Sequence, residues 1–258
     1  MAKAARESWT RGGRRGPGTT CYGVAYEYLF NVSYHLRKAG LKKQVKVTYV
    51  TSEPFIGHFG VGGLPLGKTL LGTLLRKERI DAVTNASMTS VEDGRVTLAD
   101  SRTVDFDYAM IVPPLVGQDV VRTCTDITDG QGFVNVRDTY QTLPYDNVYA
   151  VGAAAVDTPW QTPTPVGIPA TGLPIDKQAQ AAARNIASQI KGEQPMDHGE
   201  FGERPAVCVM DAGNNGVVIM ADHLMPPRKH GVLIPGPQAQ AMKLGFEKYF
   251  MWRRATAM

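Results

Sequence analysis

The stretch Gly16-Pro-Gly18-Thr-Thr-Cys21-Tyr-Gly23-Val-Ala-Tyr-Glu27 is the part of this 258-residue chain that decides its fold. Its first six residues have the spacing of a dinucleotide-binding turn, G-x-G-x-x-G, with cysteine in the place of the third glycine. Four apolar residues follow at helical spacing, and they are Val24, Tyr28, Val32 and Leu36. The pattern therefore predicts a helix after the turn, which ends near Gly40.

Cys21 is expected at or just before the amino end of this helix. Free backbone N–H groups and the helix dipole favour a thiolate there, and the thiolate is the nucleophilic form of cysteine. The stretch thus favours a loop that presents a reactive sulfur. Spacing leaves open the alternative that Cys21 is a small apolar residue that packs the helix against a strand.

The composition is that of an ordinary globular protein, with 43% hydrophobic and 20% charged residues. Lys and Arg number 28 against 24 Asp and Glu, and a net charge of +4 is too small to indicate a nucleic-acid partner. No apolar run approaches the roughly 20 residues of a membrane-spanning helix, and no signal-peptide pattern is visible. The three cysteines at 21, 124 and 208 lack zinc-like spacing, so no metal site is predicted.

The first half of the chain has the pattern of an α/β fold without its first strand. It predicts a strand over residues 44–50, a helix over residues 67–79 and short strands around the Asp93-Gly94 turn. Residues 108–112 predict a strand that is buried on both faces. A βαβ unit needs an apolar strand before its glycine turn, whereas residues 4–15 are mostly polar and basic. We therefore expect the chain to begin inside a larger fold.

The segment after the first strand contains two titratable residues. Glu53 lies at the carboxyl end of the strand, where an acid can hold a ribose hydroxyl; an ordinary strand-end turn is the favoured alternative. His58 follows in a glycine-rich loop, where an imidazole could titrate near neutral pH; a purely structural histidine is its alternative.

The second half begins with an apolar run over residues 147–151, which predicts a buried strand that stops at Gly152. Backbone without a side chain could approach a cofactor at this glycine, and a plain strand and turn is the alternative. Residues 174–190 then predict a helix that begins with proline. Its expected inward residues are Ala179, Ala182, Ala183 and Ile186.

The last part of the chain predicts a hairpin and a helix. Residues 205–210 and 216–221 form the hairpin, and Cys208 lies in the middle of its first strand, where a core role is the alternative to a catalytic one. Residues 237–258 predict an amphipathic helix that mixes aromatic with basic side chains. Such a helix suits a membrane surface, and a helix that simply packs onto the protein is the alternative.

These segments together resemble sulfide:quinone oxidoreductases, flavoproteins of the two-dinucleotide-binding-domain class. Five motifs occur in the family's order over about residues 18–252. They are Cys21-Tyr-Gly-Val-Ala-Tyr-Glu-Tyr, Thr51-Ser-Glu-Pro-Phe-Ile-Gly-His58, Thr164-Pro-Val-Gly-Ile-Pro-Ala-Thr-Gly172, Ala206-Val-Cys208-Val-Met-Asp-Ala-Gly213 and Lys243-Leu-Gly-Phe246-Glu-Lys-Tyr. The resemblance implies a partial FAD/NAD(P)-binding, Rossmann-like α/β fold of three-layer ββα character, without the first FAD-binding βαβ unit.

The resemblance also implies roles for individual residues. Cys21 and Cys208 match the family's redox pair, which faces the flavin of FAD. Gly152 and Gly172 match backbone positions beside FAD, and Lys243 matches a lysine near the flavin ring.

Two further residues match the family's substrate side. Phe246 matches an aromatic residue of the quinone pocket, and His58 matches a histidine near the active site. The implied substrates are sulfide and a quinone. The C-terminal helix is expected to hold the protein peripherally on the cytoplasmic or periplasmic face of the cell membrane, and a homo-oligomer is left open.

The chain departs from the family at its amino end. The family's first third, with the loop that binds the FAD pyrophosphate and a third cysteine, has no match here, and Cys124 does not replace that cysteine. Because that loop supplies a helix N-terminus for the phosphates, we expect this chain alone to bind FAD poorly or not at all.

The expected division of the chain follows the resemblance. It comprises a basic, disorder-prone segment (1–15), an incomplete NAD-like domain (16–144), the C-terminal part of the FAD domain (145–235) and the C-terminal helix (236–258). Two other functions are left open. One is the flavoprotein subunit of a flavocytochrome c-type sulfide dehydrogenase, and the other is an inactive remnant that does not bind FAD.

Overall fold

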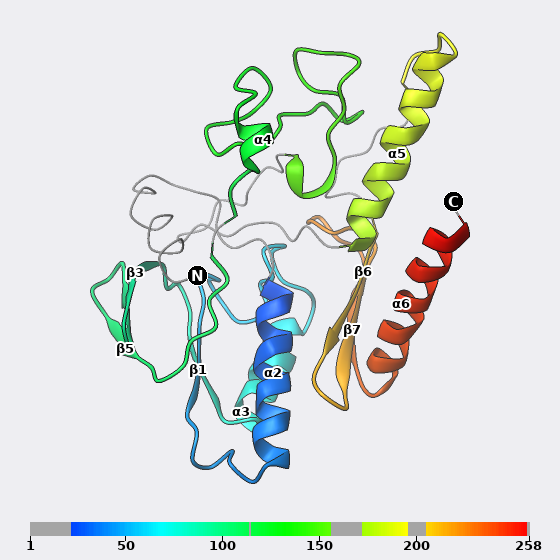
Figure 1. Cartoon of the computed structure of the whole chain (residues 1–258). Helices are drawn as coiled ribbons and strands as arrows, with labels where there is room; N and C mark the ends of the chain where they lie inside the picture. The colour runs from blue at the N-terminus through cyan, green and yellow to red at the C-terminus, as the bar shows by residue number, and fades with distance from the viewer. Residues whose placement is uncertain (1–21, 114, 156–171, 196–204, 257–258) are drawn as a thin grey trace.

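The computed structural model describes residues 22–113, 115–155, 172–195 and 205–256, and Figure 1 shows their arrangement. These residues form three small sheets: one parallel pair and two three-stranded sheets. Cys21 and the motif over residues 164–171 lie outside the described residues.

The first unit is a parallel β-α-β arrangement preceded by a helix. Helix α2 (Tyr22–Lys38) leads to β1 (Val47–Val50), and α3 (Gly67–Lys77) connects β1 to β2 (Ile80–Val83). β1 and β2 pair in parallel along their whole length. Gly40, with a φ of +73°, follows α2 as predicted, because glycine adopts this left-handed conformation without strain.

The second unit is an antiparallel sheet of β3 (Met88–Glu92), β4 (Arg95–Leu98) and β5 (Thr103–Asp105). The Asp93-Gly94 turn joins β3 to β4, which confirms the prediction for this turn. The sheet has a small core of its own, made of Ala86, Val96 and Leu98.

The third unit is the antiparallel sheet of β6 (Ala206–Asp211), β7 (Gly216–Ala221) and β8 (Gly231–Pro235), followed by α6 (Gln238–Thr256). The β6–β7 hairpin and α6 were predicted, and β8 was not. Figure 1 shows β6 and β7 between α2 and α6, and both helices contact β6. The sheet is therefore the middle layer of the region where three of the predicted motifs meet.

The main core joins the first and third units. Its buried members come from α2, β1, the loop after β1, α3, β2, β6 and β7. They are Tyr22, Tyr26, Leu29, Phe30, Tyr49, Phe59, Val61, Leu71, Leu75, Ile80, Met210, Val217 and Ile219. Apolar burial of this extent is the main source of stability in a folded chain.

The remaining helices are α4 (Asp119–Arg122), the short 3₁₀ helix η1 (Gly152–Ala154) and α5 (Gly172–Ile190). α5 was predicted, but its inward face was placed wrongly. Ala182 is buried, whereas Ala179, Ala183 and Ile186 are exposed. The buried residues are Pro174, Gln178, Ala181, Ala182 and Asn185.

Two predicted strands do not form regular strands. Residues 108–112 are assigned to none of the described sheets, and the Tyr108 side chain is 76% exposed. Residues 147–151 contribute one isolated bridge, between Tyr149 and Gln141, and Val148 is exposed. A strand forms only when a neighbour satisfies its backbone hydrogen bonds, and the described parallel sheet consists of β1 and β2 alone.

Candidate functional site

Glu27 links α2 to β6 and α6, the strand and the helix that carry Cys208 and Lys243. Its Oε1 accepts a hydrogen bond from Lys243 Nζ on α6 at 2.6 Å and another from the backbone N–H of Asp211, at the end of β6, at 2.9 Å. The Glu27 side chain is 25% exposed, so the ion pair is partly shielded from water. One carboxylate thus links the motifs that contain Cys21, Cys208 and Lys243.

Sequence reasoning did not single out Glu27. The available signal was its position as the one charged residue in the otherwise uncharged run over residues 24–30. A charge in the middle of such a helix segment needs a partner or water. The sequence could not show that this partner would come from more than 200 residues further along the chain.

Cys208 lies in the middle of β6, opposite Ile219 on β7. Its side chain is half-buried and packs against the main core, on the side of the sheet that faces α2. Tyr22, which follows Cys21 in the sequence, is 2% exposed and belongs to the same core.

His58 is buried in the loop between β1 and α3. Its Nδ1 accepts a hydrogen bond from the Gly60 N–H at 3.2 Å, and its ring lies edge-on to Phe55 at a centroid distance of 5.2 Å. Burial lowers the pKa of His58, and the positive charge of Arg228 lowers it further. The accepted hydrogen bond requires Nδ1 to be unprotonated, so the geometry also favours the neutral imidazole.

Glu53 has a structural role. Its Oε2 accepts hydrogen bonds from the hydroxyl groups of Tyr26 at 2.9 Å, Tyr49 at 3.0 Å and Thr51 at 3.1 Å. Its Oε1 accepts one from the Phe59 N–H at 2.8 Å. Burial raises the pKa of this carboxyl, and the four hydrogen bonds act against that rise. With its oxygens occupied inside the core, Glu53 is not placed to hold a ribose.

Gly152 and Gly172 lie near one another in the fold, because η1 packs against α5. The Gly152 N–H donates to Gln178 Oε1 at 2.6 Å. Gly152 has a φ of +66°, and a side chain there would approach Ile175 Cγ2 to 2.9 Å, so both backbone conformation and space require glycine. Gly172 is the first residue of α5, and a Cβ there would meet no atom of the described residues within 4 Å.

Helix α6 carries Lys243 and Phe246 one turn apart, both half-buried. An ion pair of 2.7 Å between Arg253 and Asp176 links α6 to α5. The exposed large apolar side chains of α6 are Leu244, Tyr249, Met251 and Trp252. Within the described residues, no helix has the length and apolar character needed to cross a membrane.

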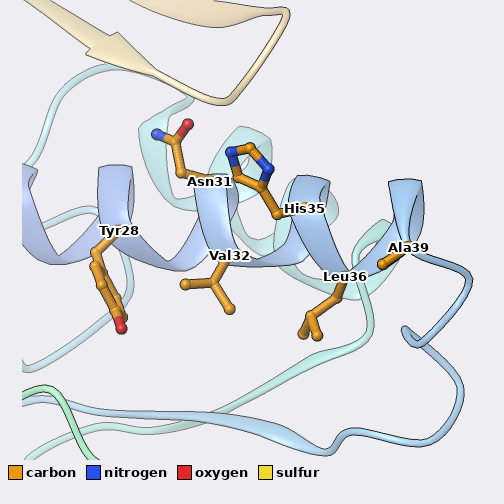
Figure 2. A pocket seen from close by; sticks show the side chains of 6 residues that line it. All are labelled: Tyr28, Asn31, Val32, His35, Leu36 and Ala39. Carbon is orange, nitrogen blue, oxygen red and sulfur yellow. The ribbon is translucent and has the colours of Figure 1, made fainter.

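The apolar stripe predicted on α2 does not face the core. Figure 2 shows that Tyr28, Val32 and Leu36 line a shallow surface hollow with Asn31, His35 and Ala39. The buried face of α2 instead consists of Tyr22, Tyr26, Leu29, Phe30 and Ser33. None of the predicted site residues lines this hollow.

Comparison with known proteins gives a consistent result. The sulfide-quinone reductase of Aquifex aeolicus is 33% identical over 245 residues, which cover 92% of this chain and 56% of the relative. The X-ray structure of the sulfide:quinone oxidoreductase from Aquifex aeolicus superposes with a TM-score of 0.85 over the same shares of the two chains. The chain thus spans a little over half the length of these relatives. No family model matches the chain.

A more distant likeness concerns the fold alone. A chain in the cryo-EM structure of the Tetrahymena thermophila mitochondrial ATP synthase has a TM-score of 0.50 and 19% identity, over 74% of this chain and 44% of that chain.

The chain is an α/β protein of the FAD/NAD(P)-binding oxidoreductase class, as the sequence predicted. This follows from its β-α-β unit, its antiparallel sheet with Cys208 and the close superposition. Within that class the chain is a homologue of sulfide-quinone reductase, which confirms the resemblance drawn from the five motifs.

Proposed function

We propose that the chain carries the cysteine and quinone sides of a sulfide:quinone oxidoreductase, with Cys21 and Cys208 as the reacting pair. The observation that supports this most directly is the junction at Glu27. It joins the helix that follows Cys21, the strand that contains Cys208 and the helix that contains Lys243 and Phe246. The homology covers 56% of the relative's length, so the reaction of this chain is part of what we propose.

The proposed reaction starts from a disulfide between Cys21 and Cys208. Hydrosulfide attacks one sulfur; a new S–S bond forms and the old one breaks, which leaves a persulfide on one cysteine and a thiolate on the other. Re-forming the bridge as a trisulfide releases one proton and two electrons. The quinone takes up both electrons and two protons. Bound FAD would supply the two-electron relay between the sulfurs and the quinone.

Several described residues fit FAD. Lys243 keeps two further N–H donors beyond its bond to Glu27, and its charge would favour a negative flavin. Gly152 brings backbone close to the amino end of α5, and a Cβ at Gly172 would meet no atom of the described residues within 4 Å. A helix N-terminus favours a negatively charged group. We propose that this chain alone binds FAD poorly or not at all, because no stretch of its sequence matches the family's pyrophosphate loop.

The quinone side is proposed to lie along α6. Phe246 would contribute to an apolar pocket, and the exposed Tyr249 and Trp252, together with Lys248 and Arg254, would rest on the lipid headgroups. This surface would place the protein peripherally on the cytoplasmic or periplasmic face of the membrane. The proposal keeps the expected domain boundaries: the NAD-like domain ends at residue 144, and the part of the FAD domain ends at residue 235, before the C-terminal helix.

The deciding experiment is sulfide-dependent reduction of a short-chain quinone by the full chain with added FAD, with and without the amino-terminal third of the Aquifex aeolicus relative as a separate polypeptide. Cys21→Ser and Cys208→Ser should each abolish turnover, because either change removes one half of the sulfur bridge. Cys124→Ser is the matched control, since Cys124 is exposed in the turn after α4 and should be dispensable.

The possible results separate the proposed functions. Full activity in either bridge variant would contradict the mechanism. Reduction of cytochrome c in place of quinone would favour the flavocytochrome-type subunit. An absence of electron transfer under both conditions, with no FAD spectrum, would favour the inactive remnant.

A further inference from the structure

Arg228 connects two loops that are distant in the sequence. It lies in the connection between β7 and β8, over residues 222–230, and its half-buried guanidinium donates to four backbone carbonyls. Two belong to its own connection, those of His223 and Leu224. The other two belong to the loop that carries His58, namely Val61 and Gly63, the latter at 2.6 Å.

We propose that Arg228 is a positioning residue that fixes the His58 loop against the sheet of Cys208 and keeps the His58 imidazole neutral, with its proton on Nε2. The inference rests on the proposed function for the relevance of His58 to catalysis. The anchoring of the loop rests only on the hydrogen bonds of Arg228 to Val61 and Gly63.

The His58 loop needs such an anchor because its backbone is unusual. Positive φ values occur at Phe59 and at four glycines, 57, 60, 62 and 63. A non-glycine residue such as Phe59, with a φ of 56°, is held there only when its surroundings determine the conformation. The carbonyl of His58 itself accepts from the N–H groups of Val61 and Gly63.

Three side chains hold the backbone of this loop around His58. The Tyr26 hydroxyl accepts from the Gly57 N–H, and Glu53 accepts from the Phe59 N–H. Both of these lie in the first unit of the fold. Arg228 is the anchor that comes from the unit of Cys208, and it binds the carbonyls of Val61 and Gly63.

The guanidinium suits this task better than an ammonium group would. Its planar fork offers five N–H donors in fixed directions, and here it reaches carbonyls on two loops at once. The negative charge of Asp222 acts on Arg228, and the positive charge of Arg228 in turn acts on His58. Burial, the charge of Arg228 and the Gly60 N–H bond at Nδ1 all oppose protonation of His58.

The charged and titratable groups around the loop come from several elements. Glu53 is in the loop itself, Tyr26 is on α2, and Lys68 on α3 lies over the Phe55 ring. The β7–β8 connection that contains Arg228 also carries Asp222, His223, Lys229 and His230. Of these neighbours, Arg228 acts most directly on the imidazole of His58.

The test uses the full chain without substrate, so it is independent of any activity. Histidine ring resonances are followed by NMR against pH, with His58 assigned through His58→Gln, and amide hydrogen exchange is measured for Val61 and Gly63. Arg228→Met should raise the titration midpoint of His58 and speed exchange at both amides about tenfold or more. Arg228→Lys keeps the charge without the fork, so it should speed exchange while the midpoint stays low.

Arg102→Met is the matched control, because Arg102 makes only an exposed pair with Asp100. It should change neither readout. Unchanged exchange at Val61 and Gly63 in Arg228→Lys would overturn the positioning role, even if Arg228→Met failed to fold. A wild-type spectrum with the His58 proton on Nδ1 would overturn the assigned tautomer.

Discussion

The core region formed by α2, β1, α3 and β6–β8 differs sharply from the segment between β5 and η1. Both contain apolar runs, but the run over residues 108–112 in that segment is exposed or half-buried. Leu71 on α3 is fully buried, whereas Tyr108 is 76% and Val120 77% exposed. The core region combines helices with paired strands, while residues 108–112 belong to none of the described sheets. An apolar strand pattern therefore becomes a buried strand only when a neighbouring strand can pair with it.

The largest expected effect tests this contrast directly. Leu71→Ala should lower the free energy of unfolding by about 3 kcal/mol, because it leaves a cavity in the main core. Tyr108→Ala should change it by less than about 0.5 kcal/mol, because its exposed hydroxyl reaches only Tyr28. Urea unfolding followed by circular dichroism measures both. Equal losses would show that residues 108–112 are as well packed as the core.

A second prediction concerns the buried carboxylate of the core region. Glu53→Gln should lower the free energy of unfolding by about 2 kcal/mol at pH 7, because the amide cannot accept all four hydrogen bonds. The folded-state pKa of Glu53 is raised above its ordinary 4.5, so the folded state binds the proton more tightly than the unfolded chain. The wild type therefore gains stability, relative to the variant, as the pH falls toward 4.5.

The measurement for this prediction is a series of urea unfolding curves between pH 4.5 and 8. The difference between wild type and variant should widen toward the acid end. Glu247→Gln is the matched control, because Glu247 is exposed on α6. A difference that narrows on acidification would mean that the pKa of Glu53 is lowered by its hydrogen bonds.

The smallest expected effect concerns the junction itself. A double-mutant cycle on Glu27→Gln and Lys243→Met should give a coupling energy of about 1 kcal/mol, since the pair is partly buried and Glu27 also holds the Asp211 N–H. The same cycle on the Arg95–Asp105 pair, whose side chains are both more than half exposed, should show no measurable coupling. Equal coupling energies in the two cycles would show that the Glu27–Lys243 pair is no stronger than an exposed ion pair.

Much of the fold could be predicted because its signals are local. Helical spacing and end residues predicted α2, α3, α5 and α6, and the Asp93-Gly94 turn predicted the hairpin of β3 and β4. Which face of each helix is buried was harder to predict. On α5, Ile186 was expected inside and is exposed, whereas the polar Gln178 is buried because it holds the Gly152 N–H.

Part of the candidate site also rests on signals within the sequence. Motif order predicts roles for Cys208, Lys243 and His58 without any knowledge of their contacts. Glu27 was missed because its partners, Lys243 and Asp211, lie 216 and 184 residues away. Arg228 was missed because it acts on backbone carbonyls, which have no signature in the sequence.

By itself the sequence determined the class of fold, the helices and hairpins, and the homology to sulfide-quinone reductase, because spacing, turn residues and motif order are properties of the chain. Only the tertiary structure decided which faces are buried, that Glu53 is structural, and that Glu27 and Arg228 tie distant segments together. The reason is physical: burial and hydrogen bonding depend on which segments meet, and segments hundreds of residues apart meet only in the folded chain.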